Sequence, residues 1–304
     1  MRIVFMGTPD YATQILKGLV NSDIEVSLLV TQPDKPVGRK QILTPPHVKA
    51  WVKKEDICLD IYQPKSLRND EAKERISAHK PDFIVVAAYG QILPVEILNI
   101  APCINLHASL LPKYRGASPI QSSILNGDKF TGVTAMLMEE GLDSGDILAF
   151  KYVQMFDCRV DELFDELSIA ASKLTLLVLN NFESIEPIKQ IGADATHCVK
   201  IKKNNGLFSF KQSAKEIYTK FKAYTPWPGL FLENGLKIKK IELLDETKQF
   251  EKSAVILEIS KDYIVIACQI GSLKILKVQA PSKKEISAVE YVRGKRMEVG
   301  SSLV

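Results

Sequence analysis

The stretch Phe83-Ile84-Val85-Val86-Ala87-Ala88 is an uninterrupted apolar run. Such a run is typical of a strand that is buried on both faces of a parallel sheet. Further short apolar runs lie at residues 2–6, 24–30 and 103–106, and residues 10–21 between the first two have the apolar spacing of a helix. This alternation predicts an α/β fold with a doubly wound parallel sheet, whose ligands bind at the carboxyl ends of the strands.

The turn after the first expected strand indicates whether the chain binds a dinucleotide cofactor. It reads Gly7-Thr8-Pro9-Asp10 and lacks the Gly-x-Gly-x-x-Gly spacing that a dinucleotide pyrophosphate requires. We therefore expect a Rossmann-like sheet that does not bind a dinucleotide, and we interpret Gly7 as a tight-turn residue.

The sequence Asn105-Leu106-His107 stands at the end of an expected strand. Because side chains alternate along a strand, Asn105 and His107 point to the same face. An amide N–H and an imidazole N–H can both stabilise the negative charge that develops on a carbonyl oxygen under attack by an amine. The imidazole can also carry the proton that the amine loses. An asparagine and a histidine at this spacing more commonly have a structural role. The neighbouring motifs must therefore decide whether this pair is catalytic.

An acidic loop flanked by glycines follows the strand expected at residues 131–138. It reads Gly141-Leu142-Asp143-Ser144-Gly145-Asp146, and the glycines allow backbone angles that bring a carboxylate close to a ligand. Asp143 is the candidate partner of His107, because a nearby carboxylate orients an imidazole ring. The alternative is a plain tight turn, and we interpret Asp146 as a turn or strand-start residue.

Length and composition limit the class of protein. A chain of 304 residues with 46% hydrophobic and 25% charged residues is typical of a globular protein with two domains. No apolar run approaches the roughly 20 residues of a membrane-spanning helix, and the short apolar start does not read as a signal peptide. The five cysteines are scattered and never spaced as Cys-x-x-Cys. They favour a reducing, cytoplasmic compartment and argue against a metal site.

Charge is distributed unevenly along the chain. Residues 200–304 contain 20 Lys and Arg against 11 Asp and Glu, whereas residues 1–199 contain 20 against 25. A basic C-terminal third indicates a surface for a polyanion. The alternative, which composition alone leaves open, is a small domain with solvated lysines.

The C-terminal part has the pattern of a smaller β domain. It follows an irregular segment and begins with a helical pattern at residues 213–222. Alternating or apolar runs then occur at residues 237–243, 254–259, 263–268 and 273–278. They predict a small antiparallel barrel or sandwich. We therefore expect domains at residues 1–188 and 206–304, joined by a linker at residues 189–205.

Taken together, these motifs resemble the signature of the folate-dependent formyltransferases. The core of the resemblance is Asn105-Leu106-His107-Ala108-Ser109-Leu110-Leu111-Pro112, followed by Tyr114-Arg115-Gly116-Ala117 and Pro119-Ile120. The flanking motifs are Phe5-Met6-Gly7-Thr8-Pro9, Ala87-Ala88-Tyr89-Gly90, Gly141-Leu142-Asp143-x-Gly145-Asp146 and Tyr224-x-Pro226-Trp227-Pro228. They are similar to the branch of the family that acts on initiator methionyl-tRNA. The resemblance covers essentially the whole chain.

The resemblance implies the chemistry and the residues that carry it. The catalytic residues would be Asn105, His107 and Asp143. The folate site would be lined by Ser109, Leu110, Leu111 and Pro112. The formyl donor would be 10-formyltetrahydrofolate, and the free α-amino group of methionyl initiator tRNA would attack its formyl carbon directly. This reaction requires no metal and no covalent enzyme intermediate.

The resemblance also implies how tRNA is bound. Residues 32–41 resemble an insertion that enters the end of the acceptor stem, and Lys35, Arg39 and Lys40 suit contacts with phosphates. The proline and glycine content of this loop suits a mobile segment that becomes ordered on binding. Residues 206–304 would form an OB-like barrel that binds the tRNA. We expect the protein to act as a monomer.

Two other functions remain open from the sequence. One is a related folate enzyme that acts on a small amine, such as a purine precursor or an amino sugar, or that hydrolyses formyltetrahydrofolate. Such an enzyme would need neither the basic residues 200–304 nor the loop at residues 32–41. The other is an RNA-binding protein with an inert folate-like site. It would have lost part of the catalytic set, yet Asn105, His107 and Asp143 are all present.

Overall fold

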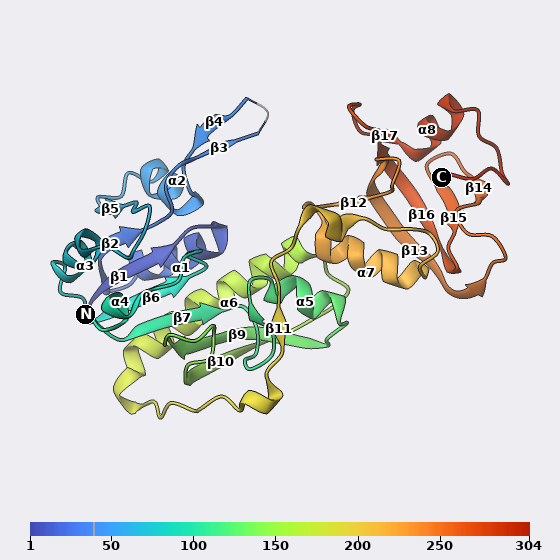
Figure 1. The fold of residues 1–304 in the computed structure, drawn as a ribbon. Helices are drawn as coiled ribbons and strands as arrows, with labels where there is room; N and C mark the ends of the chain where they lie inside the picture. Colours follow the sequence, from blue (N-terminus) through green and yellow to red (C-terminus); the bar gives the residue numbers. More distant parts are fainter. Residues whose placement is uncertain (39) are drawn as a thin grey trace. The chain divides into compact units, whose positions relative to one another are not determined.

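The computed structural model describes residues 1–38 and 40–304, which form two compact units (Figure 1). The first unit consists of Met1–Pro119, Lys129–Phe156 and Glu162–Val199. The second consists of Ile120–Asp128, Asp157–Asp161 and Lys200–Val304. Two short segments from the middle of the chain therefore belong to the unit that is otherwise C-terminal.

The first unit is built on a seven-stranded sheet with the order β10-β9-β7-β6-β1-β2-β5. Its strands are β1 (Arg2–Gly7), β2 (Glu25–Val30), β5 (Ile61–Tyr62), β6 (Phe83–Ala87), β7 (Cys103–His107), β9 (Phe130–Leu137) and β10 (Ile147–Gln154). Neighbouring strands from β7 to β5 are parallel, whereas β9 is antiparallel to both β7 and β10. The mostly parallel, doubly wound sheet expected from the sequence is confirmed, with an antiparallel edge.

Helices cover both faces of this sheet. They are α1 (Asp10–Val20), α2 (His47–Lys54), α3 (Asp70–Ser77), α4 (Val95–Leu98) and α6 (Val160–Asn181). On one face, Ile84 of β6 belongs to an apolar cluster with Ile76 of α3 and Ile97 of α4. Phe83 points to the opposite face and meets Phe182, just beyond α6, with ring centroids 4.7 Å apart. Burial on both faces explains the uninterrupted apolar run of β6.

A hairpin forms a separate two-stranded sheet and projects from the first unit (Figure 1). It consists of β3 (Lys35–Val37) and β4 (Ile42–Thr44). The sequence predicted a mobile loop at residues 32–41, and the structure has paired strands in and beyond that range. Arg39 lies outside the described residues.

The second unit contains an antiparallel sheet with the order β12-β13-β16-β15-β14, and β17 also pairs with β16. Its strands are β12 (Leu230–Phe231), β13 (Lys237–Gln249), β14 (Ile256–Ile259), β15 (Ile264–Ala267), β16 (Ile270–Gln279) and β17 (Ile286–Ser287). Its helices are α5 (Pro119–Leu125, from Ile120 onward), α7 (Ala214–Tyr224) and α8 (Ala288–Gly294). The expectation of an antiparallel β structure in the C-terminal part is confirmed.

Two serines explain where the later helices begin. Ser213 accepts a hydrogen bond from the backbone N–H of Glu216, whose side chain accepts from the N–H of Ser213 in return. Ser287 and Glu290 form the same arrangement before α8. Such reciprocal caps satisfy backbone donors that a helix leaves free at its start.

Candidate active site

The candidate site is built on β7, where Asn105 and His107 point to one face of the sheet. They alternate with Ile104 and Leu106, which are 1% and 2% exposed. β7 lies between the parallel strand β6 and the antiparallel strand β9. On the β6 side, Asn105 pairs with Val86. On the same face, the neighbouring strands bury apolar side chains in the cluster under α3 and α4. At β7 this face instead carries polar side chains. The strand thus holds both candidate donors on a rigid element.

The acidic loop reaches these side chains from an unexpected direction. Because β9 is antiparallel to β7, the loop after β9 starts beside the amino end of β7, where the N–H of Met138 donates to the carbonyl of Cys103 at 2.8 Å. The loop then turns back over the sheet before β10 begins. Gly145 permits this path, since a Cβ atom there would lie 1.9 Å from the carbonyl oxygen of Leu137. Asp143 itself has a left-handed φ of 50°.

The side chains of Asn105, His107 and Asp143 come together at this point. The Asn105 amide donates to Oδ1 of Asp143 at 3.3 Å. Nδ1 of His107 lies 3.7 Å from Oδ2 of the same carboxylate. The His107 and Asp143 side chains are only 7% and 14% exposed, so little solvent screens the pair. One carboxylate therefore orients both groups that could stabilise an oxyanion.

The segment after β7 completes the surroundings of the carboxylate and the imidazole. The backbone N–H of Gly116 donates to Oδ2 of Asp143 at 2.9 Å. Nε2 of His107 lies 2.9 Å from the carbonyl oxygen of Tyr114. Since a carbonyl only accepts hydrogen bonds, Nε2 carries a proton, and the other ring nitrogen faces Asp143. A proton on Nδ1 would therefore lie directly beside the carboxylate.

The expected folate residues form a tightly held turn. The Ser109 side chain is fully buried and donates to the carbonyl of Lys113 at 2.6 Å. The Thr134 hydroxyl donates to the carbonyl of Ser109 and accepts from the N–H of Leu111. Leu111 is buried with neighbouring strand residues of β9 and β10. Leu110 and Pro112 are half-buried and are the members of this set whose side chains remain partly accessible.

Three further residues in contact with the site lie in the segment that the sequence suggested as a linker. Gln190 accepts from Arg115 and donates to the carbonyl oxygens of Asp143 and Gly145. The Thr196 hydroxyl accepts from the N–H of Tyr114 at 2.9 Å. The Cys198 thiol donates to the carbonyl of Tyr114 at 3.3 Å. No sequence motif marked them, because each acts through a contact with residues about 45 to 85 positions away.

A short strand pair holds this segment against the site. β11 (His197–Cys198) runs parallel to β8 (Arg115–Gly116). The approach is close at Gly116, where a Cβ atom would lie 2.2 Å from the carbonyl oxygen of Cys198. Gly116 also has a φ of 119°, which other residues rarely adopt. Glycine is therefore required at the residue whose N–H binds Asp143.

Two of the three expected tRNA-binding residues lie on the hairpin. Lys35 and Lys40 are exposed, and so are the apolar Val37, Ile42 and Leu43, which are 55%, 61% and 65% exposed. Exposed apolar side chains beside lysines are unusual for a solvated loop and are typical of a binding surface.

A polar network fixes the base of the hairpin. Lys49 of α2 donates to both carboxylate oxygens of Asp34 at 2.8 and 2.9 Å and to Oε1 of Gln63 at 2.6 Å. Gln63 donates to Asp34 at 2.8 Å and to the carbonyl of Gln32 at 2.7 Å. Hydrogen bonds from Lys49 and Gln63 hold the pKa of Asp34 below its usual range. The hairpin therefore leaves the unit from a defined anchor.

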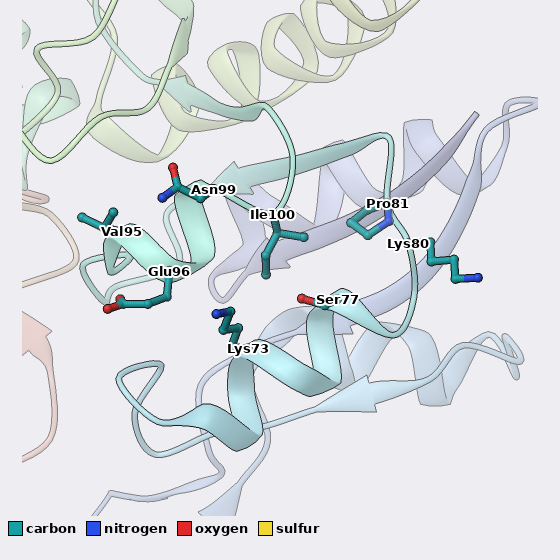
Figure 2. Close-up of a pocket in the computed structure, with 8 residues that line it drawn as sticks. All are labelled: Lys73, Ser77, Lys80, Pro81, Val95, Glu96, Asn99 and Ile100. Atoms are coloured by element: carbon teal, nitrogen blue, oxygen red, sulfur yellow. The ribbon is translucent and has the colours of Figure 1, made fainter.

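A pocket of about 440 Å³ lies elsewhere in the first unit, between α3, α4 and the turn before β6 (Figure 2). Its lining residues are Lys73, Ser77, Lys80, Pro81, Val95, Glu96, Asn99 and Ile100. The turn and Ile100 precede β6 and β7, so the pocket lies at the amino ends of these strands. His107 is the last residue of β7. The pocket is thus separate from the candidate active site.

Within residues 1–38 and 40–304, no group of three or more His, Cys, Asp or Glu side chains is arranged to bind a metal ion. Cys103, four residues before His107, is buried, and burial raises the pKa of its thiol to about 12. The thiol therefore remains protonated near neutral pH and is a poor metal ligand. Among the described helices, none has both the length and the apolar character to span a membrane.

Comparison with known families defines the class of this protein. The profile described as "Formyl transferase" matches residues 1–174, and that described as "Formyl transferase, C-terminal domain" matches residues 200–296. The first match alone covers more than half of the chain. The chain belongs to the formyl transferase family, which confirms the resemblance inferred from its motifs.

The relatives within that family are more specific. The chain is 56% identical to a methionyl-tRNA formyltransferase of a Nitratiruptor species, over 99% of each chain. It is 51% identical to a methionyl-tRNA formyltransferase of Campylobacter hominis, over 100% of each chain. It therefore has the full length of these relatives.

Solved structures with the same fold are more distant in sequence. HypX from Aquifex aeolicus in complex with tetrahydrofolic acid matches 96% of this chain with a TM-score of 0.66 at 18% identity. The chain spans 47% of that protein. WlaRD, a sugar 3N-formyl transferase, matches 93% of this chain and 99% of its own, with a TM-score of 0.66 at 17% identity. At these identities the likeness concerns the fold alone.

Proposed function

We propose that this protein transfers the formyl group of 10-formyltetrahydrofolate to the α-amino group of methionyl initiator tRNA, giving N-formylmethionyl-tRNA. Its full-length identity of 51–56% to methionyl-tRNA formyltransferases supports the acceptor and the donor. The observation that supports the chemistry is the convergence of Asn105, His107 and Asp143, with contacts of 3.3 and 3.7 Å to one carboxylate.

The reaction is a direct exchange of one C–N bond for another. The methionyl amine forms a bond to the formyl carbon, giving a tetrahedral oxyanion, and collapse breaks the bond between that carbon and N10 of the folate. The proton that the amine loses is delivered to N10. Asn105 donates a hydrogen bond to the oxyanion, and His107 donates one when a ring N–H exchanges its partner in the free protein, the Tyr114 carbonyl or the Asp143 carboxylate, for the oxyanion. His107 moves the proton, and Asp143 holds the imidazole and the amide in place.

The turn at residues 109–112 supports the folate assignment through its shape. Burial of Ser109 and Leu111 fixes the backbone, which leaves Leu110 and Pro112 as the side chains that a flat pterin ring would meet. Apolar surface beside a few fixed polar groups is the usual composition of such a site. 10-Formyltetrahydrofolate supplies only the formyl group, because the hydrogen-bond donors and the group that moves the proton are side chains of the protein.

The hairpin and the second unit support tRNA as the carrier of the amine. Lys35 and Lys40 add positive charge to the hairpin, beside its exposed apolar side chains, and the sequence adds Arg39 between them. The second unit is basic over residues 200–304, with 20 Lys and Arg against 11 Asp and Glu. Phosphate contacts of this kind provide affinity that depends little on sequence. We further propose that the protein acts as a monomer in the cytoplasm.

One assay distinguishes this function from the two alternatives. The purified protein is incubated with 10-formyltetrahydrofolate and either charged initiator methionyl-tRNA or a small amine, glycinamide ribonucleotide or an amino sugar nucleotide. We expect formylation of the tRNA only. Formylation of a small amine without the tRNA would instead assign a small-molecule transferase. Tight tRNA binding without any transfer would assign an RNA-binding protein with an inert site.

Arg39→Ala should reduce the use of tRNA without affecting the folate site. A charged hydrogen bond to phosphate contributes about 1.5–3 kcal/mol, so kcat/KM for methionyl-tRNA should fall by roughly 10- to 100-fold. The dissociation constant for a folate analogue, measured by calorimetry, should not change. Equal losses for both ligands would remove the hairpin from tRNA recognition. Arg68→Ala, an exposed arginine elsewhere in the first unit, provides the control.

Binding of tRNA should weaken steeply with salt. If about four phosphates are neutralised, the affinity should fall roughly 10²-fold between about 50 and 200 mM salt, because the released counterions make binding salt-dependent. Filter binding or fluorescence anisotropy with initiator tRNA measures this slope. A flat response would show that the basic second unit does not bind the tRNA backbone.

A further inference from the structure

We propose that Gln190 is a positioning residue for the catalytic carboxylate, a role that rests on the function proposed above. Its carboxamide joins two loops that are far apart in the chain. Oε1 accepts from Nε and Nη2 of Arg115 at 3.0 and 2.7 Å. Nε2 donates to the carbonyl oxygens of Asp143 and Gly145 at 2.9 and 2.7 Å. Gln190 thus ties the acidic loop to the segment that follows β7.

The orientation of this carboxamide is fixed by its partners. The Arg115 guanidinium can only donate, and the carbonyl oxygens of Asp143 and Gly145 can only accept. A flip of the amide would set its NH₂ group against the guanidinium and its oxygen against two oxygens. Gln190 therefore has one arrangement in which every contact is favourable. Arg115, with two hydrogen bonds to Oε1, selects that arrangement.

The chain on either side of Gln190 is also anchored. Ile188 and Ile147 each donate a backbone hydrogen bond to the other at 2.8 Å, which attaches the segment to the start of β10. At the other end, β11 pairs with β8. The segment thus crosses from the acidic loop to the Arg115 loop, and Gln190 lies between its two attachments.

Asp143 needs such support because of its backbone. Its φ of 50° lies in the left-handed region, which residues with a Cβ atom adopt less readily than the extended or right-handed helical regions, although aspartate tolerates it better than most. Gly116 holds the carboxylate at 2.9 Å, whereas Gln190 holds the carbonyl of the same residue. Without Gln190 the peptide loses this hydrogen bond to its carbonyl oxygen. Its carboxylate can then move away from Asn105 and His107, which lie 3.3 and 3.7 Å from it.

Gln190→Leu tests this role by separating kcat from KM. A catalytic group misplaced by about 1 Å can cost about 10²-fold in rate, so kcat should fall by about that factor. KM for folate and for tRNA should change little, because Gln190 acts on the carboxylate and not on either substrate. Gln154→Leu, which replaces an exposed glutamine at the end of β10, is the matched control and should retain the full rate. A rise in KM with kcat unchanged would overturn the proposal.

A double variant shows whether Gln190 acts through Asp143. In an Asp143→Asn background, Gln190→Leu should cost less than about twofold, because the group that it positions has already lost its function. A further loss of about 10²-fold in the double variant would assign Gln190 a separate role and would overturn the proposal. If Gln190→Leu does not fold, Gln190→Glu replaces it. This variant retains the contact with Arg115 and sets an oxygen against the two carbonyl oxygens.

Hydrogen exchange tests the positioning itself without any formyl transfer. Backbone amides at residues 139–146 should exchange faster in Gln190→Leu, while Tm stays within about 2 °C of the parent protein. Unchanged exchange would overturn the proposal whatever the kinetics. Faster exchange in a protein whose parent formylates no acceptor would support the positioning role and reject the proposed function.

Discussion

Replacing His107 with alanine should lower kcat for formyl transfer by about 10³-fold while leaving the affinity for tRNA intact. The change removes one oxyanion donor, which typically costs about 10²–10³ in rate, together with the group that moves the proton. His107 lies on β7, and the tRNA contacts are proposed on a different element, the hairpin of β3 and β4. Single-turnover formylation of methionyl initiator tRNA measures the rate, and anisotropy measures the affinity.

His79→Ala is the matched control for this experiment. Its ring also faces a carboxylate, with Nε2 3.4 Å from Oδ2 of Asp60, but on the surface of the first unit. We expect this variant to retain the parental rate. An undiminished rate in His107→Ala would exclude His107 from the chemistry, and a parallel loss of tRNA affinity would show that the substitution acts on binding.

Asp143→Asn should lower kcat by roughly 10³-fold as well, although it changes a single atom. Both carboxylate oxygens accept hydrogen bonds: Oδ1 from Asn105, and Oδ2 from the N–H of Gly116. An asparagine must direct its NH₂ group at one of these donors. It also removes the negative charge beside Nδ1 of His107. The variant thus loses both the orientation of the donors and the partner of the imidazole.

Asp146→Asn provides the comparison within the same loop. Its backbone carbonyl accepts from the N–H of Leu137 at 2.8 Å, a contact that the substitution preserves. We expect unchanged turnover for this variant. Stopped-flow measurements over a pH series extend the test, since a rate in Asp143→Asn equal to that of the parent at every pH would reject the assignment of Asp143.

Local patterns were sufficient to predict the core of the fold and the candidate residues of the site. The apolar run of β6 predicted a strand covered on both faces, because such a strand buries consecutive side chains against helices on either side of the sheet. Alternation along β7 put Asn105 and His107 on one face, and the structure has both there. The antiparallel strands of the C-terminal part followed from their alternating patterns. Two of them, β13 and β16, extend beyond the predicted ranges, whereas β14 and β15 are shorter than predicted.

Contacts between distant segments were beyond the reach of such patterns. The sequence indicated no direction for β9, so it did not show that the acidic loop starts at the amino end of β7 and turns back. Nor did it mark Gln190, Thr196 and Cys198, because an irregular segment with little periodicity reads as a linker. Their contacts depend on a chain path that brings residues 188–198 back against the loops around β7 and β10. Only three-dimensional pairing reveals such a path.

The anchored hairpin has an implication for how acceptor choice can diverge within this architecture. Its two strands pair with each other and form a sheet of their own, and the Asp34, Lys49 and Gln63 network closes its base. The hairpin is therefore structurally independent of the main sheet, so its length and the residues at its tip can change with little disturbance of the Rossmann-like framework. Given the role proposed for the hairpin, a chimera that carries a foreign tip on the native base should retain formyl transfer and change its preference among acceptors.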